Sequence, residues 1–220
     1  MKKPPTAEVT MQVYYTNIRV EMAGIVPGHC TRILDVGCGE GNFGQLLKEK
    51  NRAEVWGVEL SEKAAVLAGE KLDRVFAGDF MVLFPELPKG YFDCIIFNDV
   101  LEHFTDPDHV LELCKEILVH GGYVVSSIPN VRYIRNLYEV IIQRDWEYKA
   151  GGILDRTHYR FFTKKSIIRM FTMAGYEVER CTGIKPTPNI LARLLGLITL
   201  GYMADTKFLQ FATVAKKKPE

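Results

Sequence analysis

Short apolar runs alternate along the chain with segments in which apolar residues recur at helical spacing. The runs are rich in β-branched and aliphatic residues, which is typical of buried strands, and they occupy residues 31–36, 54–59, 74–77, 92–97 and 123–128. Helical spacing follows from residue 43, at 61–68 and at 107–119, with Ser61 in the position of an N-terminal cap. This alternation predicts right-handed crossovers and a mainly parallel sheet with helices on both faces.

The pattern changes on either side of this alternation. Apolar residues from Val9 to Ile25 recur at helical spacing and predict a leading helix that ends before Pro27. After the fifth strand comes a segment rich in tyrosine, tryptophan, arginine and histidine, residues 130–162, where we expect substrate to bind. The remaining elements predicted are a helix at 163–174, a strand at 176–181, an apolar helix at 190–203 and a last strand at 208–215.

The helix predicted at 190–203 is apolar on all sides apart from Arg193. Such a helix is buried by packing within its own chain, by a partner subunit or against a membrane surface, and we expect the first of these. A homodimer and a lipid-like substrate are the alternatives. The run is shorter than the ~20 residues that span a bilayer, so no transmembrane segment is predicted.

Composition and charge narrow the range of functions. Of the 220 residues, 47% are hydrophobic and 25% are charged, which is typical of a globular protein with a substantial core. Lysine and arginine number 28 against 27 aspartate and glutamate, so no overall field attracts nucleic acid. The five cysteines form no C-x-x-C pair and no apolar signal segment is evident, so we expect buried thiols and a cytoplasmic location.

The residues that follow the predicted strands carry the candidate chemistry, because open α/β sheets bind ligands outside the carboxyl ends of their strands. The first strand leads into Asp35-Val-Gly37-Cys-Gly39-Glu-Gly41, whose glycines allow a tight turn and a close approach of the backbone to a ligand. Glu59 ends the second strand, where a carboxylate can accept both hydroxyl protons of a ribose. A nucleoside-like ligand is therefore predicted.

The charges beside these glycines indicate which nucleoside is bound. Asp35 and Glu40 flank the turn, and two carboxylates disfavour the diphosphate of a dinucleotide. They favour a ligand that is cationic there, such as S-adenosylmethionine with its ammonium and sulfonium groups. Asp79, after the third strand, can accept a hydrogen bond from the adenine amino group. No G-x-x-x-x-G-K-[ST] motif occurs, which excludes an ordinary P-loop nucleotide hydrolase.

Over roughly residues 30–180, the glycine loop with Gly57-Val-Glu59 and Gly78-Asp79 resembles the motifs of class I S-adenosylmethionine-dependent methyltransferases. The resemblance implies a doubly wound, Rossmann-like α/β fold with a seven-stranded, mostly parallel sheet whose last strand is antiparallel. It also implies that the glycine loop cradles the methionine part of the cofactor, Glu59 binds the ribose, Asp79 and Phe80 hold the adenine, and Asn98 lies near the methionine end. The expected cofactor-binding residues are Asp35, Gly37, Cys38, Gly39, Gly41, Glu59, Leu60, Asp79, Phe80, Asn98 and Val100.

On this interpretation residues 1–220 form one methyltransferase domain. Its parts are an N-terminal helix at 1–29, a cofactor-binding core at 30–129, a substrate-side insertion at 130–162 and the C-terminal part of the sheet at 163–220. The insertion offers arginines for an anionic group and aromatic rings for a pocket wall. The expected substrate-binding residues are Tyr133, Trp146, Arg156, Tyr159 and Arg160.

The segment from Asn98 to Phe104 resembles the subgroup of small-molecule O-methyltransferases that includes the ubiquinone-biosynthesis enzymes. A related pattern of acidic residues and histidines occurs in methyltransferases that act on the 3′ end of small RNAs. We expect a hydroxyl acceptor on a small molecule such as a sugar or a quinone precursor, with S-adenosylhomocysteine as the second product. The alternatives are an RNA 2′-O-methyltransferase, against which the balanced charge argues, and a regulatory protein that binds the cofactor without turnover.

Methyl transfer from a sulfonium is an in-line displacement, so most of the catalysis comes from positioning, and a base helps when the acceptor is a hydroxyl. His103 and His158 are candidate bases because neutral imidazole suits proton removal near pH 7, and Asp99 completes the candidate catalytic set. This interpretation assigns no metal. A metal-assisted alternative gathers Asp99, Glu102, His103 and His158 around Mg²⁺, which would lower the pKa of the acceptor hydroxyl.

Overall fold

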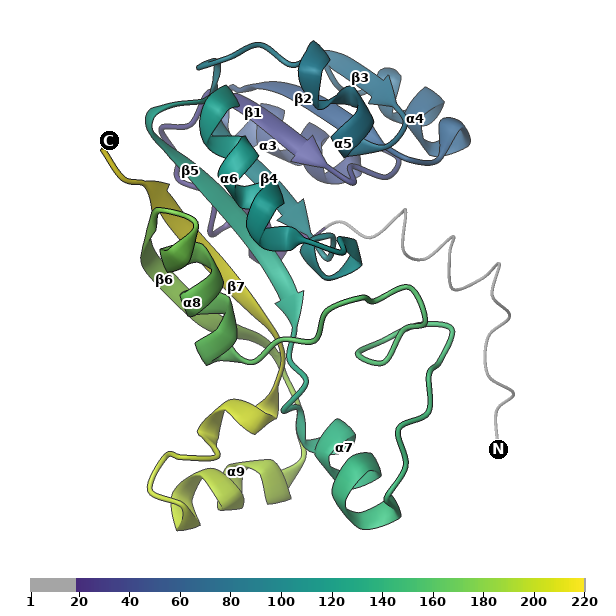
Figure 1. The fold of residues 1–220 in the computed structure, drawn as a ribbon, viewed down its shortest axis with the longest axis vertical. Coiled ribbons are helices and arrows are strands. Elements are labelled where there is room, and N and C mark those ends of the chain that lie inside the picture. The colour runs from purple at the N-terminus through teal and green to yellow at the C-terminus, as the bar shows by residue number, and fades with distance from the viewer. Residues whose placement is uncertain (1–18, 220) are drawn as a thin grey trace.

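Seven strands form one sheet in the computed structural model, which describes residues 19–219 (Figure 1). They are β1 (Arg32–Val36), β2 (Glu54–Glu59), β3 (Arg74–Ala77), β4 (Phe92–Asn98), β5 (Leu118–Pro129), β6 (Tyr176–Pro186) and β7 (Phe208–Lys217). Their order across the sheet is β3-β2-β1-β4-β5-β7-β6. Neighbours pair in parallel except at β7, which runs antiparallel to both β5 and β6. The predicted α/β fold class, with its antiparallel last strand, is confirmed.

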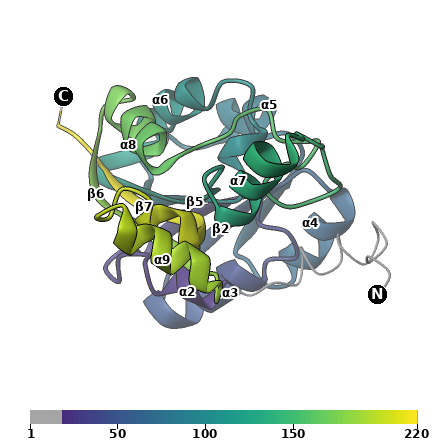
Figure 2. The same ribbon diagram turned by 90° about the horizontal axis from the view of Figure 1, so that it is seen from below.

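Helices cover both faces of the sheet (Figure 2). On one face lie α2 (Val20–Ala23), α3 (Asn42–Asn51) and α4 (Glu62–Gly69), and on the other α5 (Phe80–Leu83), α6 (Pro107–Ile117) and α8 (Lys164–Met173). Alternate residues of β1 serve the two cores: Ile33 belongs to the cluster that contains Met22 and Leu47, and Leu34 to the cluster that contains Leu111 and Phe171. The near-continuous apolar strands of the sequence are thus explained by burial on both faces.

Side chains that the sequence places before its helices cap them. The hydroxyl of Ser61 accepts a hydrogen bond from the backbone N–H of Ala64 at the start of α4. Asp106 caps α6 in the same way, and Thr163 forms a reciprocal capping box with Ser166 at α8. Each cap satisfies backbone donors that the first helical turn leaves unpaired.

Several predicted boundaries shift. Helix α6 ends at Ile117, two residues before the predicted end, because Leu118 already pairs with Phe92 and opens β5 five residues early. Gly121 has a φ of +70°, so it bends the strand where the sequence predicts the end of a helix. Of the predicted leading helix, residues 9–18 lie outside the described part, and Val20–Ala23 is helical.

The segment 130–162 projects beyond the sheet and returns to it (Figure 1). It contains α7 (Ile134–Leu137) and the π-helical turn η3 (Tyr138–Gln143), and it rejoins the sheet through a bridge between Asn130 and Phe162. Three short 3-10 helices, η1 (Phe84–Glu86), η2 (Leu101–His103) and η4 (Ala204–Lys207), complete the connections. No helix in residues 19–219 is both long enough and apolar enough to cross a bilayer.

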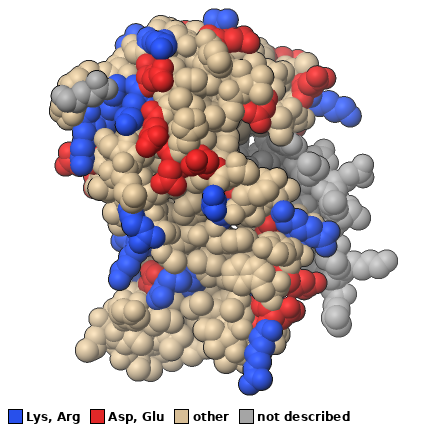
Figure 3. Space-filling model, in the orientation of Figure 1, with Lys and Arg blue, Asp and Glu red and all other residues tan. Residues whose placement is uncertain are grey.

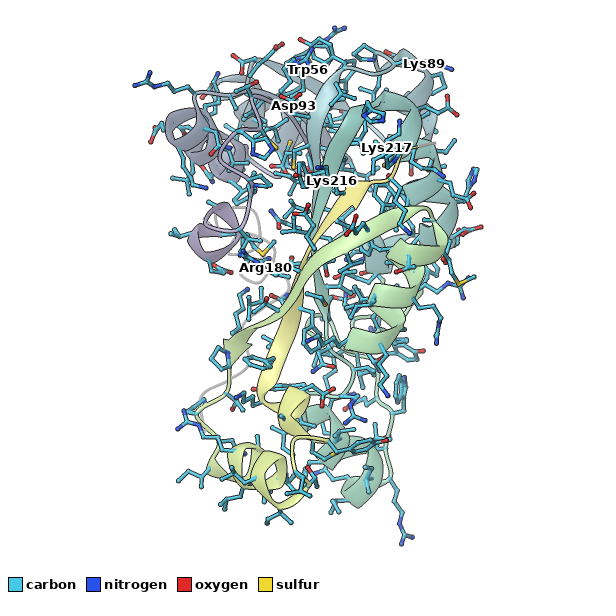
Figure 4. The ribbon with its side chains drawn as sticks, turned by 90° about the vertical axis from the view of Figure 1, so that its left-hand side faces the viewer. Trp56, Lys89, Asp93, Arg180, Lys216 and Lys217 are labelled. Carbon is cyan, nitrogen blue, oxygen red and sulfur yellow. The ribbon has the colours of Figure 1, made fainter. Side chains whose placement is uncertain are left out.

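Helix α9 (Ile190–Ile198) joins β6 to β7 at the end of the molecule where α7 lies (Figures 1 and 2). It is shorter than predicted, and of its nine residues only Ala192 is buried. The expectation that this helix packs within its own chain is therefore wrong for the described residues. Asp93, Lys216 and Lys217 mark the opposite end of the sheet, where β4 begins and the antiparallel β7 ends (Figure 4).

Candidate active site

The carboxyl ends of β1, β2 and β4 meet where the strand order reverses, because β1 pairs with β2 on one side and with β4 on the other. Doubly wound sheets bind ligands at this switch point. The loop after β1 contains Gly37, Gly39 and Gly41, with φ angles of +73°, +56° and +77°. Residues other than glycine rarely adopt this backbone conformation. Helix α3 begins directly after Gly41.

Close packing adds a second reason for glycine in this loop. A Cβ on Gly37 would lie 2.6 Å from Val100 Cγ2, and one on Gly41 would lie 3.0 Å from Ala68 Cα. The loop after β4 therefore presses directly on the glycine loop. Cys38, within the glycine loop, is buried, and its sulfur occupies the space next to Gly57.

Glu59, at the end of β2, ties the glycine loop to the start of α4. One carboxylate oxygen accepts a hydrogen bond from the backbone N–H of Gly39 at 2.8 Å, and the other accepts from the N–H of Ser61 at 2.9 Å. The side chain is buried, yet each oxygen keeps a lone pair for a further donor. The neighbouring Leu60 extends its side chain into solvent.

Asp35 is buried beside this loop. Burial raises the pKa of Asp35 to about 8, and the nearby charge of Glu59 adds to the increase. The carboxyl group is therefore mostly protonated at pH 7 in the ligand-free chain. A cation bound beside it would favour the ionised form.

Asp79 and Phe80, after β3, have mainly structural contacts. One oxygen of Asp79 accepts hydrogen bonds from the backbone of Met81 and Val82, which caps α5. The ring of Phe80 is buried and meets Phe97 edge to face, with ring centroids 5.9 Å apart. Only the backbone of Phe80 and the second oxygen of Asp79 are thus left for a ligand at this position.

The loop after β4 is strained and anchored. Asp99 has a φ of +58°, and its carboxylate pairs with Arg19 Nη1 at 2.5 Å. The same carboxylate accepts hydrogen bonds from Ser127 Oγ at 2.9 Å and Gln210 Nε2 at 2.7 Å. Asn98, one residue earlier, has a buried amide oxygen without a hydrogen-bond partner in the described part of the chain.

Glu102, His103 and His158 come together beside this loop. One ligand atom from each lies within 4.8 Å of the others, and the two imidazole rings meet edge to face with centroids 4.7 Å apart. Glu102 is 1% exposed, and within residues 19–219 neither carboxylate oxygen has a hydrogen-bond partner. Burial raises the pKa of Glu102 well above its usual range, and the charge of Asp99 adds to this.

Both histidines have a defined tautomer. The Nδ1 atom of His103 lies 3.1 Å from the carbonyl oxygen of Thr157, and that of His158 lies 2.9 Å from the carbonyl oxygen of Ile153. A carbonyl oxygen only accepts, so Nδ1 carries the proton and Nε2 of each neutral ring keeps a lone pair. Burial lowers the pKa of His103, and the neighbouring His158 lowers it further.

The insertion contacts this cluster through its backbone and its rings. The N–H groups of Tyr159 and Arg160 donate to the carbonyl oxygen of Glu102 at 2.9 and 3.2 Å. Phe161 lies 6.4 Å from the ring of His158 and 5.2 Å from that of Trp146, so these rings form a continuous wall.

Among the predicted substrate-binding residues, the side chains differ in availability. The guanidinium of Arg160 donates to the carbonyl oxygen of Thr105, whereas the side chains of Arg156 and Tyr159 are exposed. Tyr133 precedes α7 and is half-buried.

Comparison with known proteins identifies the family. A methyltransferase domain profile matches residues 11–180. Ubiquinone biosynthesis O-methyltransferase from Thiobacillus denitrificans is 28% identical over 187 residues, covering 81% of this chain and 75% of that protein. The protein of the same name from Nitrosospira multiformis is 32% identical over 174 residues, covering 74% and 70%. This chain belongs to the class I S-adenosylmethionine-dependent methyltransferases.

Solved structures agree with this methyltransferase fold. An S-adenosylmethionine-dependent methyltransferase from Archaeoglobus fulgidus superposes with a TM-score of 0.68 at 20% identity, covering 96% of this chain and 95% of that one. The [4+2]-cyclase SpnF superposes with a TM-score of 0.64 at 16% identity, covering 100% and 99%. At these identities the likeness shows the fold alone, and the reaction must be argued from the family and the site.

The sequence analysis of the methyltransferase missed the residues that hold Asp99. Arg19, Ser127 and Gln210 come from three distant parts of the chain. Gln210 is a polar residue in a mostly apolar strand, which is a weak signal of a buried polar network, but nothing in the spacing of Gln210 or Arg19 connects them to Asp99.

Proposed function

We propose that this methyltransferase transfers the methyl group of S-adenosylmethionine to a hydroxyl group of a small-molecule acceptor. The observation that carries the proposal is the group formed by the buried Glu102 and the half-buried His103 and His158, which lies beside the loop after β4 and offers two imidazole lone pairs. Relatives named as O-methyltransferases support oxygen as the methylated atom.

When bound, the cofactor supplies a methyl group on a positively charged sulfur. The backbone of the Gly37–Gly41 loop would hold its methionine part, and the buried oxygen of Asn98, which has no donor within residues 19–219, would accept from the ammonium group. Asp35 adds a carboxylate that ionises beside that cation. Glu59 uses its remaining lone pairs for the ribose hydroxyls, while Asp79 accepts from the adenine amino group. Cys38, Leu60, Phe80 and Val100 complete the site with backbone and apolar contacts.

A histidine removes the acceptor proton. Nε2 of His103 or His158 takes the hydroxyl proton as the oxygen forms its bond to the methyl carbon and the carbon–sulfur bond breaks. Because each Nδ1 is held by a backbone carbonyl, the lone pair keeps a fixed direction. We assign Asp99 to positioning rather than to proton transfer, since its carboxylate is engaged by Arg19.

The same three side chains fit a divalent metal ion. Within residues 19–219 the two buried oxygens of Glu102 have no donor, and each histidine donates its Nδ1 proton to a carbonyl oxygen, as metal-ligating histidines do. Two nitrogens and one carboxylate favour zinc, manganese, iron or cobalt over the oxygen-preferring Mg²⁺ of the sequence-based alternative. Asp99 is not in this donor set. Such an ion would lower the pKa of an acceptor hydroxyl.

The acceptor lies against the insertion in this proposal. Trp146 and Phe161 form a wall that reaches His158, and the exposed Arg156 and Tyr159 offer polar contacts. Arg160, which is held by the carbonyl oxygen of Thr105, and Tyr133, which precedes α7, are further candidates for contact with the acceptor. The residue types suit an aromatic or cyclic acceptor with an anionic or polar substituent.

The experiment is a methyl-transfer assay with labelled S-adenosylmethionine against phenols, catechols, sugars and a short RNA with a free 3′ end. We expect a phenol, catechol or sugar to be methylated on oxygen. His103→Gln or His158→Gln should lower turnover by about 10²-fold with little change in cofactor affinity, whereas the exposed His109→Gln should have no effect. Methylation of the RNA alone would favour the 2′-O alternative, and cofactor binding without any transfer would favour a regulatory protein.

A second arm of the assay tests the metal ion. The protein is treated with a chelator and then assayed with Mn²⁺, Zn²⁺ or Mg²⁺. Restoration by Mn²⁺ or Zn²⁺ but not in His158→Gln would support the three-residue site. Full activity after chelation would leave the histidines as bases alone.

A further inference from the structure

Helix α9 and the turn after it expose an unusual number of large apolar side chains. Seven of them within thirteen residues are between 46% and 97% exposed, which are Ile190, Leu191, Leu194, Leu197, Ile198, Leu200 and Tyr202. We refer to these seven residues as the α9 patch. Single exposed apolar residues are ordinary on protein surfaces, but a contiguous group marks a binding surface.

A second group extends this surface. Tyr138, Ile141 and Ile142 of η3 are also mostly exposed, and α7 and α9 lie at the same end of the molecule (Figures 1 and 2). Arg132 joins the two segments, because its guanidinium donates to the carbonyl oxygen of Tyr202 at 3.2 Å and pairs with Asp205. The exposed apolar side chains of η3 therefore lie at the same end of the molecule as the α9 patch.

Within residues 187–204, which contain the α9 patch, the charge has one sign. Residues 187–204 contain no aspartate or glutamate and one basic residue, Arg193, which is exposed. The next acidic residue, Asp205, is already paired with Arg132 at 2.8 Å. Figure 3 accordingly shows the end of the molecule over α9 as uncharged surface.

We propose that the α9 patch docks on an anionic phospholipid bilayer. Leucine and isoleucine side chains on a short amphipathic helix enter the boundary between headgroups and acyl chains, and a tyrosine such as Tyr202 suits the headgroup level. The phosphate groups of the lipids are anions that can pair with the exposed guanidinium of Arg193 at the rim of the α9 patch. The proposal does not depend on the acceptor or on the catalytic residues.

A second copy of this chain fits the patch less well. An isologous contact between two α9 patches would bring two like-charged Arg193 guanidiniums to one interface, and residues 187–204 offer no carboxylate to pair with either. A bilayer needs no such partner from the protein. The charge pattern therefore favours an anionic lipid surface over self-association.

The test is vesicle flotation of the full chain with phosphatidylcholine alone and with phosphatidylcholine mixed with phosphatidylglycerol. The wild type should float with the anionic vesicles. The double variant Leu197→Ser/Ile198→Ser, at positions 73% and 76% exposed, should reduce binding about tenfold or more. The matched control Val66→Ser/Met173→Ser, at positions 70% and 74% exposed on other helices, should bind like the wild type. Arg193→Gln should reduce binding about fivefold, and only to anionic vesicles.

Three outcomes would overturn the proposal: no flotation of the wild type with either vesicle, equal losses in the two double variants, or a wild-type dimer in sedimentation that Leu197→Ser/Ile198→Ser disperses without any lipid binding. Cofactor affinity and the thermal unfolding midpoint, measured without vesicles, should be unchanged in both double variants because all four side chains are exposed. This control also separates failure of the docking surface from failure of the proposed methyl transfer.

Discussion

Asp35 allows a quantitative test of the electrostatics at the glycine loop. Its carboxyl group is buried, and burial followed by the charge of Glu59 raises its pKa to about 8 from an ordinary value of 3.8. The folded ligand-free chain therefore binds one more proton at this site than the unfolded chain between about pH 4 and pH 8. Stability contributed by this proton is fully present below pH 4 and is lost as the pH rises toward 8.

The size of the effect follows from linkage. Each pH unit between the two pKa values lowers the free energy of unfolding by about 1.4 kcal/mol as the pH rises. Because of Asp35, the free energy of unfolding is therefore about 4 kcal/mol lower at pH 7 than at pH 4. Asp35→Asn keeps the shape of the side chain and has no proton to lose. The variant should therefore be more stable than the wild type at pH 7 to 8 and similar to it near pH 4.

Urea unfolding of both proteins at a series of pH values measures this difference directly. The informative quantity is the wild-type free energy of unfolding minus that of Asp35→Asn, because other buried carboxyl groups such as Glu102 titrate equally in both. The difference should become more negative as the pH rises from 4 to 8. A difference that stays constant over this range would refute the raised pKa and the buried, protonated state of Asp35.

Three further substitutions test the contacts around the loop. Gly37→Ala should cost about 1–3 kcal/mol of stability, because its Cβ meets Val100 at 2.6 Å, whereas Gly90→Ala, also at positive φ but in open space, should cost about 1 kcal/mol in urea unfolding. Arg19→Ala should lower the free energy of unfolding by about 3 kcal/mol, because Asp99 loses its ion pair. Adding Asp99→Asn should recover part of that loss. Equal losses in the single variant Arg19→Ala and in the double variant would rule out coupling between the two residues. Glu59→Gln should weaken S-adenosylmethionine binding about tenfold in calorimetry, and unchanged affinity would contradict its role.

The elements that carry the expected cofactor-binding residues could be predicted almost to the residue, because the sequence signals for these elements are local. β2 and β3 span the residues predicted, and Ser61 and Asp106 cap their helices as their positions indicate. Short buried strands, capping side chains and positive-φ glycines each depend on a few neighbouring residues. The boundary between α6 and β5 was less predictable, because Leu118 is drawn into the sheet by its pairing with Phe92, a contact across the sheet.

The candidate site was predictable in its residue types but not in its connections. His103 and His158 lie 55 positions apart in sequence, and the structure brings their rings together, as the metal-assisted alternative requires. The same alternative also included Asp99 as a metal ligand. In the structure Asp99 pairs with Arg19, 80 residues away, and its other contacts come from β5 and β7. Whether Asp99 is a metal ligand or a structural residue held by Arg19 thus depended on long-range contacts, which no local sequence pattern indicates.

Helix α9 shows why the burial of an apolar segment is the hardest property to predict from sequence. Its composition predicts that its apolar side chains lie out of water, but composition does not say what covers them. Within residues 19–219 only Ala192 of this helix is buried, because the helix projects beyond the end of the sheet that could have provided a core. The absence of acidic residues from the segment 187–204 then becomes the informative feature, because an arginine in a core needs a partner for its charge. Hydrophobicity and charge together, rather than hydrophobicity alone, distinguish a helix that completes a fold from one that docks on an anionic surface.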